Sequence, residues 1–168
     1  MPKDDLWDVL PSALWELDFS ETLDWIEEQK CESADAFKRV VRKDPDALSK
    51  CLDRMRVSRV SAGAVALVGA SSNEECVRRS AELLTAESKA DFLRILMAAF
   101  RREPDVHLET AMMTCGREPI DVRAHWRFVP SASGRFDRAI VSVVDMTAER
   151  DLQQRLLLAE RMSAIGTL

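Results

Sequence analysis

The side chains in this sequence that could carry chemistry are few and lie far apart. The 168 residues contain two histidines, His107 and His125, and four cysteines, Cys31, Cys51, Cys76 and Cys115. A nucleophilic side chain needs a base poised against it, and no Ser/His/Asp or Cys/His arrangement supplies one. No Cys-x-x-Cys pair or Cys/His cluster occurs either. The sequence therefore predicts neither a catalytic site nor a metal site.

The two histidines fall within strand patterns. His125 lies beside Trp126, on the same face of its strand as Arg123 and Arg127. A histidine titrates near neutral pH, so His125 could sense pH. The alternative is a solvated sheet residue, and the sequence leaves both open.

Composition excludes several classes of protein. An apolar share of 46% supports a real core, and the length fits one domain with attached helices. The net charge is −5, and residues 1–35 carry eleven acidic side chains against Lys3 and Lys30. This distribution argues against nucleic-acid binding. No apolar run is long enough to span a membrane, no signal peptide is recognisable, and the cysteines suit reduced thiols, so we expect a cytoplasmic protein.

The first third of the chain is predicted to be largely helical. Residues 1–11 include a short amphipathic helix with Leu6, Val9 and Leu10 on its apolar side. A half-buried strand follows over 13–19, because its apolar and acidic side chains alternate. Residues 20–55 then contain three helices, the first of which we expect Ser20 to cap.

The rest of the chain predicts a strand, short helices, a long helix and a meander. The strand covers 56–60, the small-residue helix 62–68 and the long helix 86–102. Three strands then cover 106–114, 120–129 and 139–146. Short turns between adjacent strands indicate antiparallel pairing. The fold class is therefore α+β, with a five-stranded antiparallel sheet and helices on one face.

Four segments resemble the PAS sensor fold in order and spacing. They are the second strand with its following helix (57–69), the segment leading into the long helix (82–88), a strand entry (116–122) and the exit Asp145-Met146-Thr147-Ala148-Glu149-Arg150. The resemblance implies a PAS domain over 12–147. The helices of 20–55 then form an extra insertion after the first strand.

Residues 148–168 are expected to form a signalling coiled-coil helix. Its end, 158–168, resembles the start of the dimerisation helix of two-component histidine kinases. In that family the phosphoacceptor histidine follows a few residues later, and the chain ends before it. The resemblance implies a homodimeric sensor fragment, without catalysis of its own, in a parent kinase that acts on a response regulator.

The PAS resemblance also implies where a small apolar ligand would bind, between the sheet and the long helix. On this interpretation the pocket is formed by Phe92, Ile95, Leu96, Leu108, Met112, Val122, Ala124, Trp126, Ile140, Ser142 and Val144. Small Ala124 and polar Ser142 would leave room and a hydrogen-bonding group. A plain packed core is the alternative, and the sequence leaves both open.

No cofactor is firmly implied. Covalent flavin chemistry needs an Asn-Cys-Arg-type signature, and the stretch 75–79 around Cys76 lacks it. Haem needs an axial ligand, commonly a histidine on the long helix, and residues 86–102 contain none. Both cofactors are therefore disfavoured.

The exit helix is the strongest functional signal. Two apolar stripes overlap out of phase, one through Leu152 and Leu156 and the other through Leu158, Met162 and Ile165. Such a seam has two near-equal packings and could switch, or it could be an ordinary two-helix contact. We expect a dimer interface of these five residues with Leu6, Val9 and Leu10. Asp145 and Thr147 would form the hinge that transmits the signal, with Thr147 as the N-cap.

Overall fold

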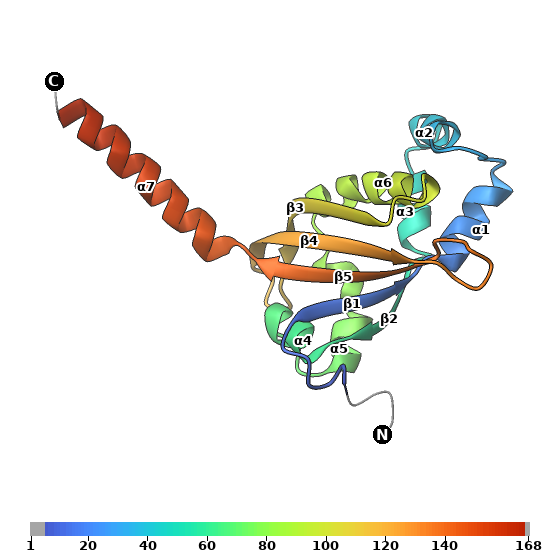
Figure 1. The fold of residues 1–168 in the computed structure, drawn as a ribbon, viewed down its shortest axis with the longest axis horizontal. Helices are drawn as coiled ribbons and strands as arrows, with labels where there is room; N and C mark the ends of the chain where they lie inside the picture. Colours follow the sequence, from blue (N-terminus) through green and yellow to red (C-terminus); the bar gives the residue numbers. More distant parts are fainter. Residues whose placement is uncertain (1–5, 167–168) are drawn as a thin grey trace.

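The structure is a computed structural model that describes residues 6–166. One antiparallel sheet of five strands, in the order β2-β1-β5-β4-β3, runs through the body (Figure 1). The strands are β1 (Ala13–Asp18), β2 (Arg56–Val60), β3 (Asp105–Met113), β4 (Pro119–Val129) and β5 (Arg138–Asp145). The predicted α+β class and five-stranded antiparallel sheet are confirmed.

Helices gather on one side of this sheet, and the last one leaves the body. They are α1 (Ser20–Glu28), α2 (Ala34–Lys43), α3 (Ala47–Leu52), α4 (Ala62–Val68), α5 (Asn73–Arg78), the 3₁₀ turn η1 (Ser80–Leu83), α6 (Ala86–Phe100) and α7 (Thr147–Gly166). Figure 1 shows α7 beginning beside the end of β5 and projecting away from the body. The three predicted helices between the first two strands are present as α1, α2 and α3.

Side-chain caps fix where four of these helices begin. The hydroxyl oxygens of Ser33, Ser61, Ser72 and Thr85 accept backbone N–H groups at the starts of α2, α4, α5 and α6. Each bond satisfies one of the N–H groups that a helix start leaves unpaired. At the end of α4, Gly69 adopts a φ of +68°, a left-handed conformation that glycine tolerates.

Two helices begin differently from our expectation. Ser20 and Thr147 are not N-caps, because each is the first residue of its helix. An aspartate two residues earlier does the capping instead: Asp18 accepts the N–H of Ser20, and Asp145 accepts that of Thr147, both at 2.8 Å. An aspartate that bonds the backbone two residues on is a turn former. The ends of β1 and β5 therefore carry the same strand-to-helix turn.

The N-terminal segment also differs from our expectation. The predicted helix over 1–11 falls partly on residues 1–5, which lie outside the described part of the chain. Within the described part, residues 6–9 form a turn, closed by bonds from the N–H groups of Val9 and Leu10 to the carbonyl of Leu6. Pro11 follows directly and stops helical continuation.

This N-terminal segment is held against the start of α4 by the backbone. The N–H groups of Ala62 and Gly63 donate to the carbonyls of Trp7 and Leu10. Ser61, which is fully buried, donates to the carbonyl of Ser12 at 2.6 Å and accepts the N–H of Leu14 at 2.9 Å. The entry to β1 is therefore fixed by direct contact with α4.

The first prediction concerns Gly63. A Cβ at this position would lie 2.2 Å from the Pro11 carbonyl oxygen and 2.5 Å from the Ser12 carbonyl carbon. We expect Gly63→Ala to lower the free energy of unfolding by about 1–3 kcal/mol, since backbone must shift to relieve the clash. Urea denaturation measures the change.

Gly116→Ala is the matched control. A Cβ at Gly116 meets only the Thr114 hydroxyl, at 3.6 Å, which is ordinary contact. We expect its unfolding free energy to stay within about 0.5 kcal/mol of the parent. Equal losses in the two variants would contradict the proposed close approach.

Candidate functional site

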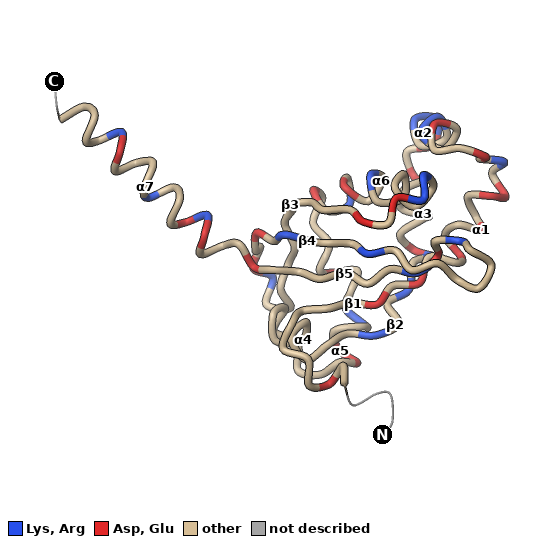
Figure 2. Tube along the Cα trace, viewed as in Figure 1, with Lys and Arg blue, Asp and Glu red and all other residues tan. Residues whose placement is uncertain are grey.

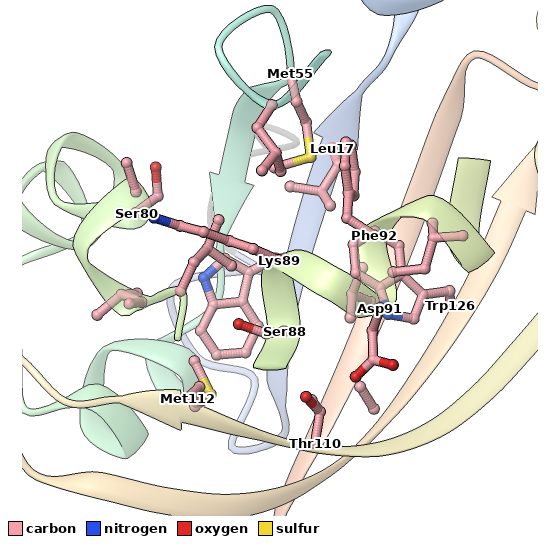
Figure 3. Close-up of a pocket in the computed structure, with 18 of the residues that line it drawn as sticks. Leu17, Met55, Ser80, Ser88, Lys89, Asp91, Phe92, Thr110, Met112 and Trp126 are labelled. Atoms are coloured by element: carbon pink, nitrogen blue, oxygen red, sulfur yellow. The ribbon is translucent and has the colours of Figure 1, made fainter. Parts of the chain in front are cut away.

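A cavity of about 420 Å³ lies between the inner face of the sheet and the helices that cover it (Figure 3). Its floor comes from all five strands, and its cover from α3, η1 and α6. This volume falls in the range of small-molecule sites, about 300–1,000 Å³. The inner face of the sheet is therefore not filled by side chains alone.

Alternation along β3 and β4 builds most of the floor. Successive side chains of a strand point to opposite faces, so every second residue reaches the cavity. The predicted pocket residues that line it are Phe92, Ile95, Leu108, Met112, Val122, Ala124 and Trp126. Leu96 is 1% exposed and belongs to the core beneath α6, but it does not line the cavity.

The prediction of which β5 residues line the cavity is wrong. Ile140, Ser142 and Val144 are not on the cavity wall, and Val144 is 57% exposed. Val141 and Val143 line the cavity instead. The pairing explains this, because Val141 lies opposite Trp126 and Trp15, and paired residues share a face. Ser142 lies opposite His125 on the outer face, so its hydroxyl does not line the cavity.

Sequence reasoning missed part of the wall. Trp15 and Leu17 of β1 contribute, as do Met55, just before β2, and Val57 of β2. Their alternation was visible in the sequence, but their distance in the chain from the long helix hid the contact. Polar residues were missed as well. The lining includes Ser49, Asp53, Ser80, Ser88, Lys89, Asp91 and Thr110.

Two buried polar atoms at this cavity have no hydrogen-bond partner among the described residues. They are the Thr110 hydroxyl oxygen and the Trp126 indole nitrogen. Thr110 is 7% exposed, and in Figure 3 its hydroxyl points away from β3 into the pocket. Most buried polar groups in proteins are paired, so each unpaired one needs a physical explanation.

The cysteines do not take part in this cavity. None of the four is among its described lining residues. Burial raises the pKa of Cys76 to about 11 and that of Cys51 to about 12. A thiolate is the reactive form of cysteine, so these thiols are poor nucleophiles at neutral pH. Cys76 therefore does not fit the role of an adduct-forming cysteine.

One residue of β4 joins the cavity wall to the exit helix. Asp121 precedes Val122, which lines the cavity. The Asp121 carbonyl accepts the N–H of Met146 at 2.7 Å, and its N–H donates to the Thr147 hydroxyl at 3.3 Å. Its carboxylate pairs with Arg150 at 2.9 Å. The first turn of α7 is thus attached to β4 through both backbone and side chain.

Arg150 extends this attachment to β3. Its guanidinium also reaches Glu109 at 3.2 Å, and Glu109 pairs with Arg123 of β4 at 3.1 Å. Hydrogen bonds, first from Arg123 and then from Arg150, hold the pKa of Glu109 below its usual range. A lowered carboxyl pKa means that the pairing is intact at neutral pH and is lost only as the pH falls through that lowered pKa.

The two histidines stack on the outer face of the sheet. Their ring centroids are 4.1 Å apart and the rings are nearly parallel. The His125 Nε2 lies 2.8 Å from an Asp105 oxygen, and Arg127 lies 2.6 Å from the other oxygen. Hydrogen bonds from Arg127 and then His125 lower the pKa of Asp105. The pH-sensing role of His125 stays a prediction.

The helix α7 carries a row of exposed apolar side chains. Leu152, Leu156 and Leu158 are 55–59% exposed, and Met162 and Ile165 are 73% exposed. The predicted N-terminal contributors Leu6 and Val9 are exposed too, at 62% and 70%. Burying a leucine is worth about 1.5–3 kcal/mol, so this row favours a partner. No helix within residues 6–166 is long and apolar enough to cross a membrane.

Comparison with known proteins places the fold. No protein-family model matches the chain, and no curated protein matches its sequence. Among solved structures, the PAS domain of a protein from Colwellia psychrerythraea matches with a TM-score of 0.53 and 11% identity, over 87% of this chain and 95% of that one.

Two further structures match at similar levels. A sensory box histidine kinase/response regulator from Burkholderia thailandensis E264 has a TM-score of 0.53 and 12% identity, over 92% of this chain and 91% of that one. An RNA-binding light-oxygen-voltage receptor has a TM-score of 0.56 and 15% identity, over 95% of this chain but 37% of that one. At these identities the matches establish the fold alone, which is the PAS fold.

The second prediction tests whether the space beside Ala124 is open. Ala124 lines the cavity, and the equally buried Ala139 lies on the same face of the sheet but outside it. We expect Ala124→Leu to keep its unfolding free energy within about 1 kcal/mol of the parent, or to raise it, since the longer side chain enters open space. Urea denaturation gives both values.

Ala139→Leu is the control for the same change in a filled core. We expect it to lose about 1–3 kcal/mol through overpacking. Comparable losses at both positions would contradict an open cavity and restore the packed-core interpretation.

Proposed function

We propose that this chain is a signal-sensing and dimerisation module that regulates an attached histidine kinase in two-component signalling. A small, largely apolar molecule in the cavity is the proposed input, and the packing of α7 against a second copy is the output. The protein acts in the cytoplasm, and a response regulator is the downstream partner.

The observation that supports this proposal is the attachment of α7 to the cavity wall through Asp121. Val122 faces the cavity, and its neighbour Asp121 contacts Met146, Thr147 and Arg150. A ligand that shifts the backbone at Val122 would shift Asp121 as well, because the two are adjacent in β4. The start of α7 then moves with it, so cavity occupancy and helix orientation are mechanically linked.

The exposed row of α7 supports the output half of the proposal. Two such rows packed together would bury leucine, methionine and isoleucine side chains that are now in water. The stripes through Leu152 and Leu158 are out of phase, so two packings compete and a small movement at Thr147 shifts their balance. The kinase connection rests on the tail sequence and on the sensory box structural neighbour.

The alternative is a ligand-free interaction module. Here the helices inserted between β1 and β2 would dock a protein partner. They are not uniformly acidic, as Figure 2 shows: α1 carries acidic side chains, and α2 carries Lys38, Arg39, Arg42 and Lys43. On this alternative the cavity stays empty of any organic molecule, and signal enters through the insertion.

Native mass spectrometry of the purified chain, followed by the same sample denatured, separates these functions. We expect a dimer that carries a small molecule and releases it on denaturation. A dimer without added mass would favour the interaction module, and a monomer would contradict the proposed output.

The third prediction is that α7 carries the dimer contact. We expect Leu156→Glu to weaken dimerisation at least tenfold, because it places a charge in an apolar seam. Gln154→Glu adds the same charge to the same exposed helix, off the apolar row, and should leave the dimer intact. Sedimentation equilibrium measures the dimer dissociation constant of each variant. Equal effects of the two substitutions would contradict a dimer contact through the apolar residues of α7.

The fourth prediction concerns switching. Cysteines at Leu152 and Leu158 report which stripe faces the partner, in a Cys115→Ser background, since the other three native cysteines are buried. We expect the ratio of the two cross-linking rates to change when the co-isolated molecule is removed. An unchanged ratio would refute the proposal that α7 changes which apolar stripe faces the partner. It would not contradict dimerisation through α7.

A further inference from the structure

We infer that the cavity selects a neutral, mainly apolar ligand that bears a hydrogen-bond acceptor such as a carbonyl or hydroxyl group. The Trp126 indole N–H and the Thr110 hydroxyl are the groups that bind it. This inference rests on the proposed ligand-sensing function and specifies the chemistry of the ligand.

Trp126 requires an acceptor. The indole nitrogen is a donor only, and in this structure it is buried at the cavity without a partner among the described residues. Tryptophan N–H groups usually find a partner when buried. The ring itself is held in place by Phe19, whose centroid lies 6.1 Å away. The Trp126 N–H is therefore a fixed donor whose proposed acceptor is an atom of the ligand.

Thr110 supplies the second polar contact. Its hydroxyl is buried, unpaired and directed into the cavity from β3 (Figure 3). A hydroxyl both donates and accepts, so it tolerates either a carbonyl or a hydroxyl on the ligand. Ala124 lies on β4 between the cavity-facing positions Val122 and Trp126, and its short side chain leaves this part of the floor open.

The charges of the lining select against an anion. The wall contains the carboxylates of Asp53 and Asp91 and one ammonium, Lys89, of which Asp53 and Lys89 are exposed to solvent. An anionic ligand would meet more negative than positive charge among these residues, and its own charge would be costly against the apolar inner wall. The remaining wall is mostly aliphatic and aromatic. A neutral ligand with an apolar body and an acceptor matches this set.

Three probes of one shape test the selection. They are 2-acetylnaphthalene, which has a carbonyl, 2-ethylnaphthalene, which has none, and 2-naphthoate, which is an anion. Binding is followed by NMR of the indole N–H signals of the four tryptophans. We expect 2-acetylnaphthalene to bind more tightly than the other two probes and to shift the Trp126 signal, which the Trp126→Phe variant assigns.

The variants show which group makes the contact. We expect Trp126→Phe to weaken 2-acetylnaphthalene binding about 5- to 10-fold more than it weakens 2-ethylnaphthalene binding, because only the carbonyl probe loses a hydrogen bond. Trp25→Phe is the control, since Trp25 lies on α1 away from the cavity and its ring contacts Arg54. Equal affinities for the carbonyl and hydrocarbon probes would overturn the inference that the ligand bears an acceptor. They would still support the cavity as a ligand site. If no probe binds, both the inference and the ligand-sensing function fail.

A second measurement needs no ligand. Replacing an unpaired buried hydroxyl by a methyl group removes an unsatisfied polar atom, so we expect Thr110→Val to raise the Tm of the ligand-free protein by about 2–4 °C. Thr22→Val is the control: Thr22 is fully buried and donates to the Cys51 carbonyl at 3.0 Å, so its loss should lower Tm. A lowered Tm in Thr110→Val would show a hydroxyl already satisfied by the protein, and would overturn its assignment to a ligand.

Discussion

The alternation of side chains along β4 is the constraint on which the rest of this structure depends. Adjacent residues of a strand face opposite sides, so Val122 lies at the cavity while Asp121 reaches the outer face and α7. The same alternation puts Ala124 and Trp126 at the cavity and His125 and Arg127 outside. The cavity wall and the attachment of α7 are thus neighbours on one strand, at Val122 and Asp121.

Where one strand face is apolar and the other charged, the sequence predicts the site well. In β4 the two sets separate cleanly, so its inward residues were predicted correctly. In β5 both sets are apolar, with Ala139, Val141 and Val143 on one face and Ile140 and Val144 on the other. Composition cannot choose between such faces, and only the pairing with β4 and β1 decides. The prediction took the wrong alternate set of β5 residues, so the residues that it expected to line the cavity lie on the outer face of the sheet.

Other failures have equally local causes. Aspartates that bond the backbone two residues on displaced the expected caps at Ser20 and Thr147, because a short acceptor before the helix competes with one inside it. Residues 6–9 have the apolar spacing of a helix, but Pro11 and the backbone bonds to Ala62 and Gly63 favour a turn. Order, strand count and most helix starts were predictable, since caps and turn residues encode them within a few positions.

The sequence left a packed core and a ligand pocket as alternatives, and the cavity between the sheet and its helices is the observation on which the proposed pocket rests. Protein interiors are close-packed, with few voids larger than a water molecule. Here a space of about 420 Å³ remains, with the Thr110 hydroxyl and the Trp126 N–H unpaired beside it. Each buried unsatisfied group costs about 1–3 kcal/mol against a net stability of about 5–15 kcal/mol. On the proposed function, a molecule that fills the space and pairs both groups would remove these costs together, and its binding energy would be available to reposition Val122, Asp121 and the start of α7.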